Sequence, residues 1–440
     1  MDATLTLTQK QIEAVQLCTD LSKRLVAVSG EPGTGKTTII KHVYDTLVAA
    51  GYRVAISAPT GKAAKRIKEA TGIDAMTNHR LLEYPHPGER DPKTGKALRS
   101  TDPQRHKQYP LEYDVVICDE FMMVNREVFQ NIVNALPSGG CLRCFGDENQ
   151  LPPIEKEVYR TAQQRATQQR ATQQKKDNKP VAPFKEVLER FTGVRLDQVH
   201  RQAEGSTIIS NAKLILSKRM PRRGDDFDIQ FTDLPIQTLR SIIEHRDIDY
   251  GSLANQIITP TKKTWVGTRE LNAMLQPMLN GQYRKTKFTV PERHSWAGTE
   301  AEQIELYVGD KVLWADNNDY KLEVFNGETG VISEIDEEVG IVYIDFGDRE
   351  VAIPPVMQAE RPDGTQIIYN PQKNIELAYA ITTHKAQGSE YDNIVYVLNR
   401  SSYYTHSRPN FYTAITRAKQ KVTLITDQRS ISSSLFKDAQ

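Results

Sequence analysis

Gly30-Glu31-Pro32-Gly33-Thr34-Gly35-Lys36-Thr37 is the stretch that decides the fold of this chain. It follows an apolar run at residues 25–29 that is typical of a β-strand, and it precedes residues 38–43, which favour a helix. A strand, a glycine-rich turn and a helix in this order form a phosphate-binding unit. The glycines let backbone N–H groups converge on phosphate oxygens, and the helix N-terminus adds a favourable dipole. The sequence therefore predicts a site for a nucleoside triphosphate rather than an ordinary glycine turn.

Within this loop the side chains have distinct expected roles. Lys36 is expected to reach the β- and γ-phosphates, and the Thr37 hydroxyl is expected to hold Mg²⁺. The nucleotide contacts predicted from the loop are those of Gly30, Gly33, Thr34, Gly35, Lys36, Thr37 and Thr38.

Length and composition limit the class of protein. At about 100–200 residues per domain, 440 residues leave room for two to four domains. No run approaches the ~18 apolar residues of a membrane span, and the N-terminus does not resemble a signal peptide. We therefore expect a cytoplasmic protein, of a bacterium or a phage-infected host, that contacts no membrane. Because the net charge is only +1, any track for a polyanion must be local.

The four cysteines do not indicate a metal site. Cys141 and Cys144 have CxxC spacing, but no second pair or histidine cluster lies near them in the sequence. Buried strand cysteines, reduced in a cytosol, are the simpler interpretation.

An acidic pair follows a second apolar run, at residues 115–118. Asp119 at the end of a buried strand is suited to hold Mg²⁺, and Glu120 is then placed to polarise an attacking water as a general base. The alternative is an exposed acidic turn, which the apolar run before it disfavours.

Further apolar runs predict the fold class. Runs at residues 54–58, 144–146, 255–259, 394–398 and 422–425 alternate with helical stretches. This alternation predicts α/β architecture, with parallel sheets covered by helices on both faces. Gln150, in the polar turn after the run at 144–146, offers a donor and an acceptor and suits a γ-phosphate sensor.

Seven motifs in order give a resemblance to a known family. They read GEPGTGKT, APTGKAA, ICDE, GDENQLPP, VHRQ, THKAQGSE and YTAITRAK. This set resembles the superfamily 1 DNA helicases, and APTGKAA and THKAQGSE resemble the 5′→3′ branch that includes RecD-like enzymes and the phage helicase Dda. The resemblance spans about Leu5 to Ile425. It implies two RecA-like domains, a β-hairpin pin that splits the duplex, and an inserted SH3-like β-barrel.

The resemblance also implies site residues. Gln9 would read the adenine edge, and Lys36, Thr37, Asp119, Glu120 and Gln150 would surround phosphate, metal and water. Arg201 and Arg417 would reach the γ-phosphate from the second domain, and Gly388 and Glu390 would line the nucleotide cleft. The implied single-strand contacts are Pro59, Thr60, Lys62, His79, Thr259, Thr383 and His384. A helix cap or a polar group of a loop is the alternative for six of these residues, which are Thr60, His79, Thr383, His384, Gly388 and Glu390. One departure from the family is Phe121-Met122, where a small residue and Ser usually follow the acidic pair.

The expected domains follow from these motifs and from changes in composition. RecA-like domain 1 would span 1–192, with the pin at 84–110 and a low-complexity insertion at 155–180. RecA-like domain 2 would span 193–278 and 372–440, with the barrel at 279–371. A surface loop is the alternative at 84–110. The five-residue repeat at 161–175 has no apolar stripe, so it is expected to be an exposed helix or a flexible arm.

Together these features predict a monomeric ATP-dependent DNA helicase that uses ATP and Mg²⁺. Its expected partners are single-stranded DNA and forked duplex DNA, with replication or single-strand-binding proteins as further candidates. The 5′→3′ direction rests on the resemblance alone. The first alternative is a single-strand-stimulated ATPase that remodels protein–DNA complexes without processive unwinding. The second, an ATP-driven switch or kinase, is disfavoured by the motifs after residue 380.

Overall fold

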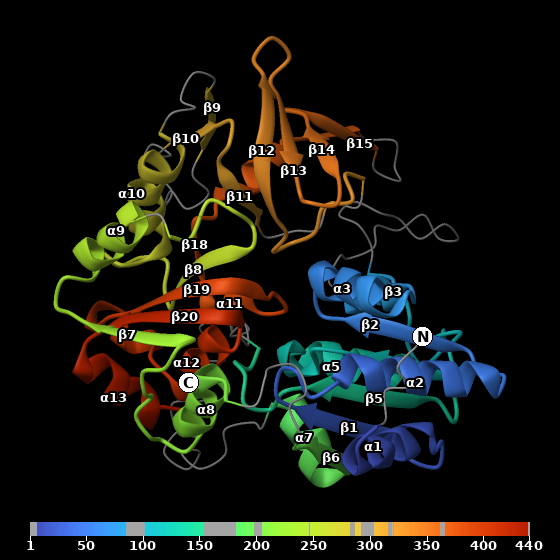
Figure 1. Ribbon diagram of the computed structural model, residues 1–440. Helices are drawn as coiled ribbons and strands as arrows, with labels where there is room; N and C mark the ends of the chain where they lie inside the picture. The colour runs from blue at the N-terminus through green and yellow to red at the C-terminus, as the bar shows by residue number, and fades with distance from the viewer. Residues whose placement is uncertain are drawn as a thin grey trace, which may run out of the picture.

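The computed structural model describes residues 7–84, 102–153, 182–197, 205–245, 247–281, 287–291, 303–315, 319, 321–360 and 366–438. The 161–175 repeat, Arg201 and residues 85–101 of the expected pin lie outside these ranges. Two α/β units lie side by side and an antiparallel sheet stands above them (Figure 1).

The first unit is built on a parallel sheet of order β3-β2-β4-β5-β1-β6. Its strands are β1 (Leu25–Gly30), β2 (Val54–Ala58), β3 (Ala75–Thr77), β4 (Val115–Cys118), β5 (Cys141–Gly146) and β6 (Thr192–Leu196). One face packs against α1 (Gln9–Thr19), α2 (Lys36–Ala49) and α3 (Gly61–Thr71). The other packs against α4 (Asn78–Leu81), η1 (Phe121–Met123), α5 (Arg126–Ala135) and α7 (Pro183–Arg190). Because both faces are covered, central strands such as β1 are buried along their whole length.

The second unit has a parallel sheet of order β18-β8-β19-β20-β7. Its strands are β7 (Phe227–Phe231), β8 (Asn255–Thr259), β18 (Ala380–Thr382), β19 (Tyr391–Leu398) and β20 (Ala418–Thr426). One face packs against α8 (Thr207–Leu216), α11 (Thr383–Ala386), α12 (Arg408–Ile415) and α13 (Gln428–Phe436). The other packs against α9 (Pro235–His245) and α10 (Thr268–Asn280), and η3 (Arg400–Thr405) follows β19.

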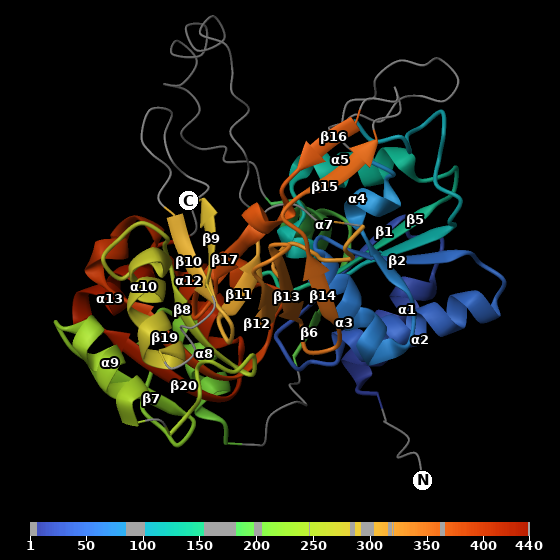
Figure 2. The same cartoon turned by 90° about the horizontal axis from the view of Figure 1, so that it is seen from above.

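Between β8 and β18 the chain forms the inserted antiparallel sheet, of order β14-β13-β12-β11-β17. Its strands are β11 (Lys311–Trp314), β12 (Thr329–Asp336), β13 (Ile341–Asp345), β14 (Glu350–Ile353) and β17 (Ile375–Leu377). Two separate hairpins accompany it, β9 (Lys287–Pro291) with β10 (Gln303–Tyr307) and β15 (Met357–Glu360) with β16 (Gln366–Tyr369), and η2 is Pro371–Asn374. The inserted sheet has its own apolar core around the buried Trp314. From above, the β15–β16 hairpin lies on the side of the first unit (Figure 2).

The predicted α/β class, with two parallel sheets and an inserted β-region, is confirmed in this architecture. Two element boundaries differ from the expected domain limits. β6 pairs with β1, so the first sheet extends to Leu196 rather than 192. β17 pairs with β11, so the insertion extends to Leu377 rather than 371. Both differences arise because strand pairing, rather than a change in composition, decides which sheet a segment joins.

The YTAITRAK motif, residues 412–419, is helical only in its first half. α12 stops at Ile415, and Ala418 already belongs to β20, where it pairs with Tyr391 of β19. Arg417 therefore lies in the connection between helix and strand. The pairing of β20 with β19 outweighs the local helical preference of these residues.

Of the expected pin, only residues 102–110 lie in the part of the chain that is described, together with Tyr84. Their backbone pairing consists of one bridge between His106 and Tyr109. The Arg105 guanidinium lies 4.3 Å from the centre of the Tyr109 ring and 2.7 Å from the Glu83 carboxylate. The hairpin itself stays a prediction.

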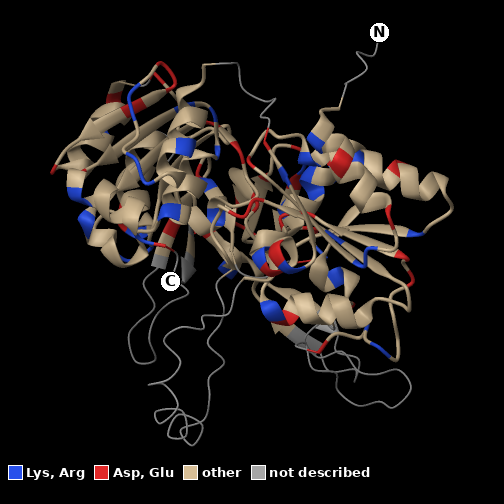
Figure 3. Cartoon of the chain, turned by 90° about the horizontal axis from the view of Figure 1, so that it is seen from below, with Lys and Arg blue, Asp and Glu red and all other residues tan. Residues whose placement is uncertain are grey.

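Three further expectations concern chemistry and charge. Cys141 and Cys144 are free, buried thiols in β5, as the simpler interpretation had it. Within the described ranges, no helix combines the length and the apolar character needed to cross a membrane. Basic and acidic residues are interspersed over both units (Figure 3), which agrees with the net charge of +1.

Candidate active site

The glycine-rich loop joins β1 to α2 at the carboxyl end of the first sheet. Gly33 and Gly35 have φ angles of 84° and 81°, a region that side chains with a Cβ rarely adopt. At Gly30, an added Cβ would lie 2.3 Å from Oγ1 of Thr34. That hydroxyl is buried and donates to the carbonyl of Glu31 at 2.8 Å. The loop therefore requires glycine at these positions, as a close backbone approach to phosphate also would.

Lys36 begins α2 and turns back over the loop. Its Nζ donates to the carbonyl oxygens of Gly30 at 2.7 Å and Glu31 at 3.2 Å. Thr37 and Thr38 follow on the first turn of the helix and are partly exposed. The ammonium group and the helix N-terminus thus lie on one side of the loop, where they provide concentrated positive potential.

The acidic pair, Asp119 and Glu120, lies at the carboxyl end of β4 in the same sheet. Asp119 directly follows β4, and its backbone N–H donates to the carbonyl of Ser57 at 2.9 Å. Glu120 has a φ of 49°, a left-handed conformation that is strained for a non-glycine residue. Burial and the neighbouring Glu120 raise the pKa of Asp119, and the Lys36 ammonium opposes this effect. Both residues are partly buried.

One observation tests whether these residues suit a divalent cation. Oδ1 of Asp119 and Oε2 of Glu120 are buried and have no hydrogen-bond partner among the described residues. Buried carboxylate oxygens without a donor are costly unless a cation or water satisfies them. Mg²⁺ takes one or two protein oxygens and completes its shell with water and phosphate, so Asp119 and Thr37 fit it.

The turn after β5 connects the first unit to the second. Gln150 is buried, and its Nε2 donates to Oδ2 of Asp147 at 3.3 Å. The hydroxyl of Tyr412, from α12, donates to the same Asp147 oxygen at 2.8 Å. Next to this pair, the Leu151 backbone N–H donates to Oγ1 of Thr413 at 2.9 Å. The expected sensor therefore lies at a hydrogen-bonded junction between the two sheets.

Asp147 was not among the residues expected from the sequence. Burial raises the pKa of its carboxyl group, and Lys36 acts in the opposite direction. This opposition implies that Asp147 lies near the Lys36 ammonium. A polar residue directly after a buried strand of a parallel sheet is the sequence signal that would have singled it out.

The predicted contact of Gln9 with the adenine stays a prediction, and the helix geometry adds a second glutamine, Gln11. Gln9 is the first residue of α1 and is exposed. Gln11 is buried, and its Nε2 donates to the backbone carbonyl of Thr34 in the phosphate loop at 3.1 Å. The capping box of α1 determines which side chains of the helix face the loop, because Thr8 and Gln11 exchange hydrogen bonds across the first turn. Gln11 is therefore the glutamine in contact with the loop.

Residues of the second sheet face the phosphate loop across a cavity of about 190 Å³. Its lining includes Glu31 and Pro32 from the loop, and Glu390, Tyr412 and Thr416 from the second unit. Gly388, with a φ of 73°, lies just before this lining. Glu390 also pairs with Arg66 of α3 at 2.5 Å. The expected cleft residues are thus brought together, apart from Arg201, which lies outside the described residues.

Arg417 is 2% exposed and lies behind this lining. Its guanidinium donates to the carbonyls of Thr413 at 3.1 Å and Ser389 at 3.4 Å, and to Oγ1 of Thr416 at 3.4 Å. These bonds are long for a charged donor. Arg417 is therefore held only loosely by its own unit.

Three of the expected single-strand contacts lie at helix starts. Thr60, which follows Pro59, caps α3 by accepting from the Ala63 N–H at 3.2 Å. Thr383 and His384 form the first turn of α11, where Thr383 is fully buried and burial lowers the pKa of His384. α3 follows β2 and α11 follows β18, so both helices start at carboxyl ends of parallel strands. Thr60 Oγ1 lies 3.9 Å from a Cβ built on Gly388, so the start of α3 lies close to the turn that follows α11.

The other expected contacts are placed differently. Lys62 lies between the units with its Nζ 5.8 Å from the centre of the Tyr391 ring, and burial lowers its pKa to about 8. Thr259 is fully buried, and its hydroxyl donates to the carbonyl of Val266 at 2.9 Å. This hydroxyl has a structural role that the strand-then-turn pattern did not reveal. His79 is exposed, with its ring centre 4.8 Å from that of Tyr84.

Two domain families match this chain. Residues 11–156 match the AAA domain, and residues 377–425 match the UvrD-like helicase C-terminal domain. The first match contains the phosphate loop, the acidic pair and Gln150, and the second contains Gly388, Glu390 and Arg417. The two halves of the site therefore coincide with the two matched domains.

Similar proteins extend over nearly the whole chain. The ATP-dependent RecD2 DNA helicase of Deinococcus radiodurans is 30% identical over 90% of this chain and 46% of its own length. This chain thus spans about half of that relative. A Pif1 helicase structure that concerns DNA unwinding at forked double-stranded DNA by two coordinating Pif1 helicases has a TM-score of 0.59 and 22% identity, covering 96% of this chain and 92% of that chain. The Bacteroides Pif1 helicase in complex with ADP-AlF3 and single-stranded DNA has a TM-score of 0.57 and 21% identity, with the same coverage of both chains.

The structural neighbours show that the fold is Pif1-like. Together with the domain matches and the RecD2 relative, they confirm the resemblance to superfamily 1 helicases that the seven motifs indicated.

Proposed function

We propose that this chain, which resembles superfamily 1 helicases of the RecD and Pif1 branch in motifs and in fold, is an ATP-dependent DNA helicase. It would move along single-stranded DNA and open duplex DNA at a fork. The observation that carries this proposal is the junction of the two parallel sheets. There Glu31 and Pro32 of the phosphate loop face Glu390 and Tyr412 across the cavity. On the turn that carries Gln150, Asp147 and Leu151 are hydrogen-bonded to Tyr412 and Thr413 of the second unit.

For hydrolysis we assign roles by position. Lys36 and the loop N–H groups bind the phosphates, and Gln11 supports the loop from α1. Thr37 and Asp119 would hold Mg²⁺, which would supply positive charge beside the phosphates. Glu120 accepts a proton from the attacking water, and its buried, partner-free oxygen supports this role.

The arginines complete the site from the second unit. Negative charge builds up on the γ-phosphoryl group in the transition state, and a guanidinium supplied across a closing cleft stabilises it. Arg417 suits this role because its present hydrogen bonds are long and easily exchanged. Arg201 is proposed on the family motif alone.

Coupling to DNA would run through the same junction. Gln387, next to Gly388, donates to the carbonyl of Leu151 at 2.9 Å, directly after Gln150. A change at the nucleotide can thus pass through this turn to α11, which begins with Thr383 and His384. Contacts between the protein and the DNA phosphate backbone carry little sequence information. Such contacts suit a motor that must move on single-stranded DNA of any sequence.

For the DNA track we propose the helix starts at Thr60 and Thr383, with Pro59, His79 and His384 near them. Lys62 and Thr259 would stabilise the protein next to this track, because their side chains contact protein groups. The inserted sheet is proposed to be an SH3-like barrel, and residues 84–110 are proposed to form the strand-separating pin. The 5′→3′ direction, the monomeric state, the cytosolic location and the replication or single-strand-binding partners stay predictions.

The experiment that tests this function is an ATPase assay with and without single-stranded DNA. We expect DNA to accelerate hydrolysis strongly, because strand binding across both units would close the cleft. Equal rates would contradict the proposal and favour a switch or kinase. Strong stimulation without displacement of a duplex strand would favour the ATPase that remodels protein–DNA complexes.

A further inference from the structure

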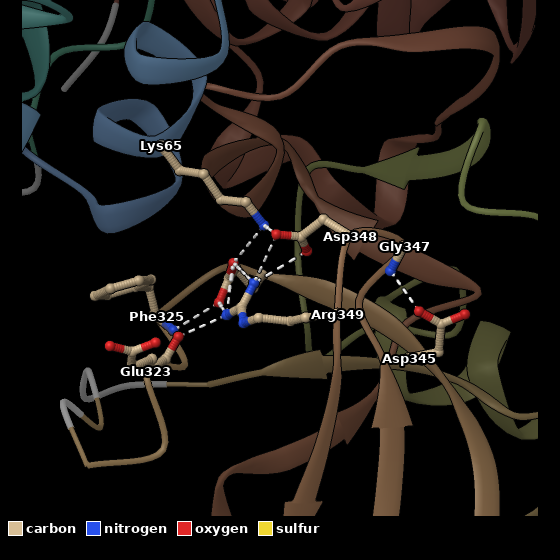
Figure 4. Close-up of polar contacts among 8 residues, drawn as sticks. Lys65, Glu323, Phe325, Asp345, Gly347, Asp348 and Arg349 are labelled. Carbon is tan, nitrogen blue, oxygen red and sulfur yellow. Dashed lines mark hydrogen bonds and ion pairs between the residues drawn. The ribbon is translucent and has the colours of Figure 1, made fainter. Parts of the chain in front are cut away.

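Two turns of the inserted sheet lie against α3 of the first unit. The first, at residues 324–328, precedes β12, and the second, at 346–349, joins β13 to β14. We call them together the acidic turns, because they present Glu328 and Asp348 to α3. Figure 4 shows Lys65 of α3 pointing toward both turns.

The contacts form a compact ion-pair network. Nζ of Lys65 lies 2.6 Å from Oδ2 of Asp348 and 3.5 Å from Oε1 of Glu328. The guanidinium of Arg349 lies 3.0 Å from Glu328 and 3.0 Å from Asp348 (Figure 4). Lys65 is the member contributed by the first unit, and the other three belong to the insertion. The side chain of Glu328 is 5% exposed, so its charge depends on these partners.

The first acidic turn also reaches the second unit. Oδ1 of Asn326 accepts from Nζ of Lys385, in α11, at 2.8 Å. At the start of α3, a Cβ added to Gly61 would lie 2.3 Å from the Phe325 ring, so this ring packs directly on the glycine backbone. One turn of the insertion therefore covers the starts of both helices that we assign to the single-strand track.

We propose that Lys65 and Lys385 form a binding site for DNA backbone phosphates, and that the acidic turns occupy this site until DNA displaces them. The inference rests on the proposed function, because it assumes that the strand crosses the starts of α3 and α11. Lys65 belongs to α3 of the first unit and Lys385 to α11 of the second. A DNA backbone that contacts both lysines would therefore connect the two units. The carboxylates of Asp348 and Glu328 hold Lys65 where phosphate oxygens would.

The balance of charges indicates that DNA displaces the acidic turns, rather than that the turns close over bound DNA. The network has two cations and two carboxylates and is neutral as it stands. When Lys65 leaves, Arg349 still pairs with Glu328 and Asp348 within the insertion, and Lys65 becomes available to phosphates. If the same turns stayed closed over a bound strand, Asp348 and Glu328 would face phosphates of like charge, which is unfavourable.

The test compares Asp348→Asn with Asp345→Asn. Asp345 lies at the end of β13, next to the second acidic turn, and its Oδ1 accepts from the Gly347 N–H at 2.7 Å, away from Lys65 (Figure 4). Both changes remove one negative charge from the same region, but only Asp348→Asn weakens the ion pairs with Lys65 and Arg349. The double variant with Lys65→Gln then separates the contribution of Lys65. Binding of a fluorescent single-stranded oligonucleotide to the full chain, measured by anisotropy, is the readout.

We expect Asp348→Asn to bind the oligonucleotide about two- to fivefold more tightly than Asp345→Asn, the range set by one partly exposed ion pair. This gain should vanish when Lys65→Gln is also present, because the freed lysine is then missing. Lys65→Gln should also reduce the slope of log affinity against log salt by about 0.7, the share of one phosphate contact on a single strand.

Three outcomes would overturn the inference: equal affinities for the two asparagine variants, weaker binding by Asp348→Asn, or a gain that persists with Lys65→Gln. Weaker binding would identify the network as a clamp on bound DNA. If the wild-type chain bound no single-stranded DNA at all, the proposed function itself would fail, and this result is distinct from the other three.

Discussion

Replacing Arg417 by alanine should separate catalysis from stability. In the transition state, a guanidinium supplied from the second domain is worth about 10³-fold or more in turnover, or about 4 kcal/mol. The hydrogen bonds that hold Arg417 within its unit are 3.1–3.4 Å long, so their loss should cost the fold little. We therefore expect Arg417→Ala to bind ATP nearly normally, to lose about 10³-fold in DNA-stimulated turnover, and to lose acceleration by DNA.

Arg143 provides a matched control. It is also fully buried, but it donates to the carbonyls of Cys18 at 2.6 Å, Lys23 at 2.7 Å and Asp20 at 3.1 Å, far along β5 from the cleft. Arg143→Ala should lower the melting temperature strongly, because it removes three hydrogen bonds of 2.6–3.1 Å that a fully buried guanidinium makes. Single-turnover hydrolysis at saturating ATP and thermal unfolding are measured for both variants. Wild-type turnover in a folded Arg417→Ala protein would refute the reasoning and make Arg201 the next candidate.

Three further predictions test separate parts of the account. Lys36→Ala should lower DNA-stimulated hydrolysis by about 10²-fold or more while circular dichroism stays unchanged, and an unaltered rate would refute the site. Burial lowers the pKa of His406 to about 4, so the fold favours its neutral form. That stabilisation is present above the unfolded pKa of about 6.5 and is lost as the pH falls below it, on the order of 2 kcal/mol by pH 5. His406→Gln should therefore show a smaller drop in melting temperature from pH 7 to pH 5, and an equal drop would contradict this cause. Deleting residues 161–175 should change the free energy of unfolding by less than about 1 kcal/mol, as judged by urea denaturation, and a variant that fails to fold would show that the repeat packs.

Most of the fold was predictable because local patterns report burial directly. Apolar runs such as 115–118 and 394–398 became central strands, since a parallel sheet covered on both faces needs continuous apolar segments. The phosphate loop and acidic pair were predictable for a similar reason, because strand, turn and helix are adjacent in the sequence.

Long-range contacts were not predictable in the same way. Tyr412 and Asp147 are 265 residues apart in sequence, and no local pattern indicates that their side chains meet. The contact of Gln11 with the phosphate loop was not predicted, because the capping box at Thr8 decides which glutamine of α1 faces inward. The assignment of Lys62 to single-stranded DNA stays a prediction, and its approach to the Tyr391 ring of the second unit is another long-range contact that the sequence does not indicate.

The most direct test of the central claim is strand displacement on a forked duplex with a 5′ single-stranded tail. The account predicts that the wild-type chain releases the displaced strand only with ATP and Mg²⁺, and that Lys36→Ala releases none under the same conditions. A wild-type chain that hydrolyses ATP in response to single-stranded DNA but leaves the fork intact would contradict it.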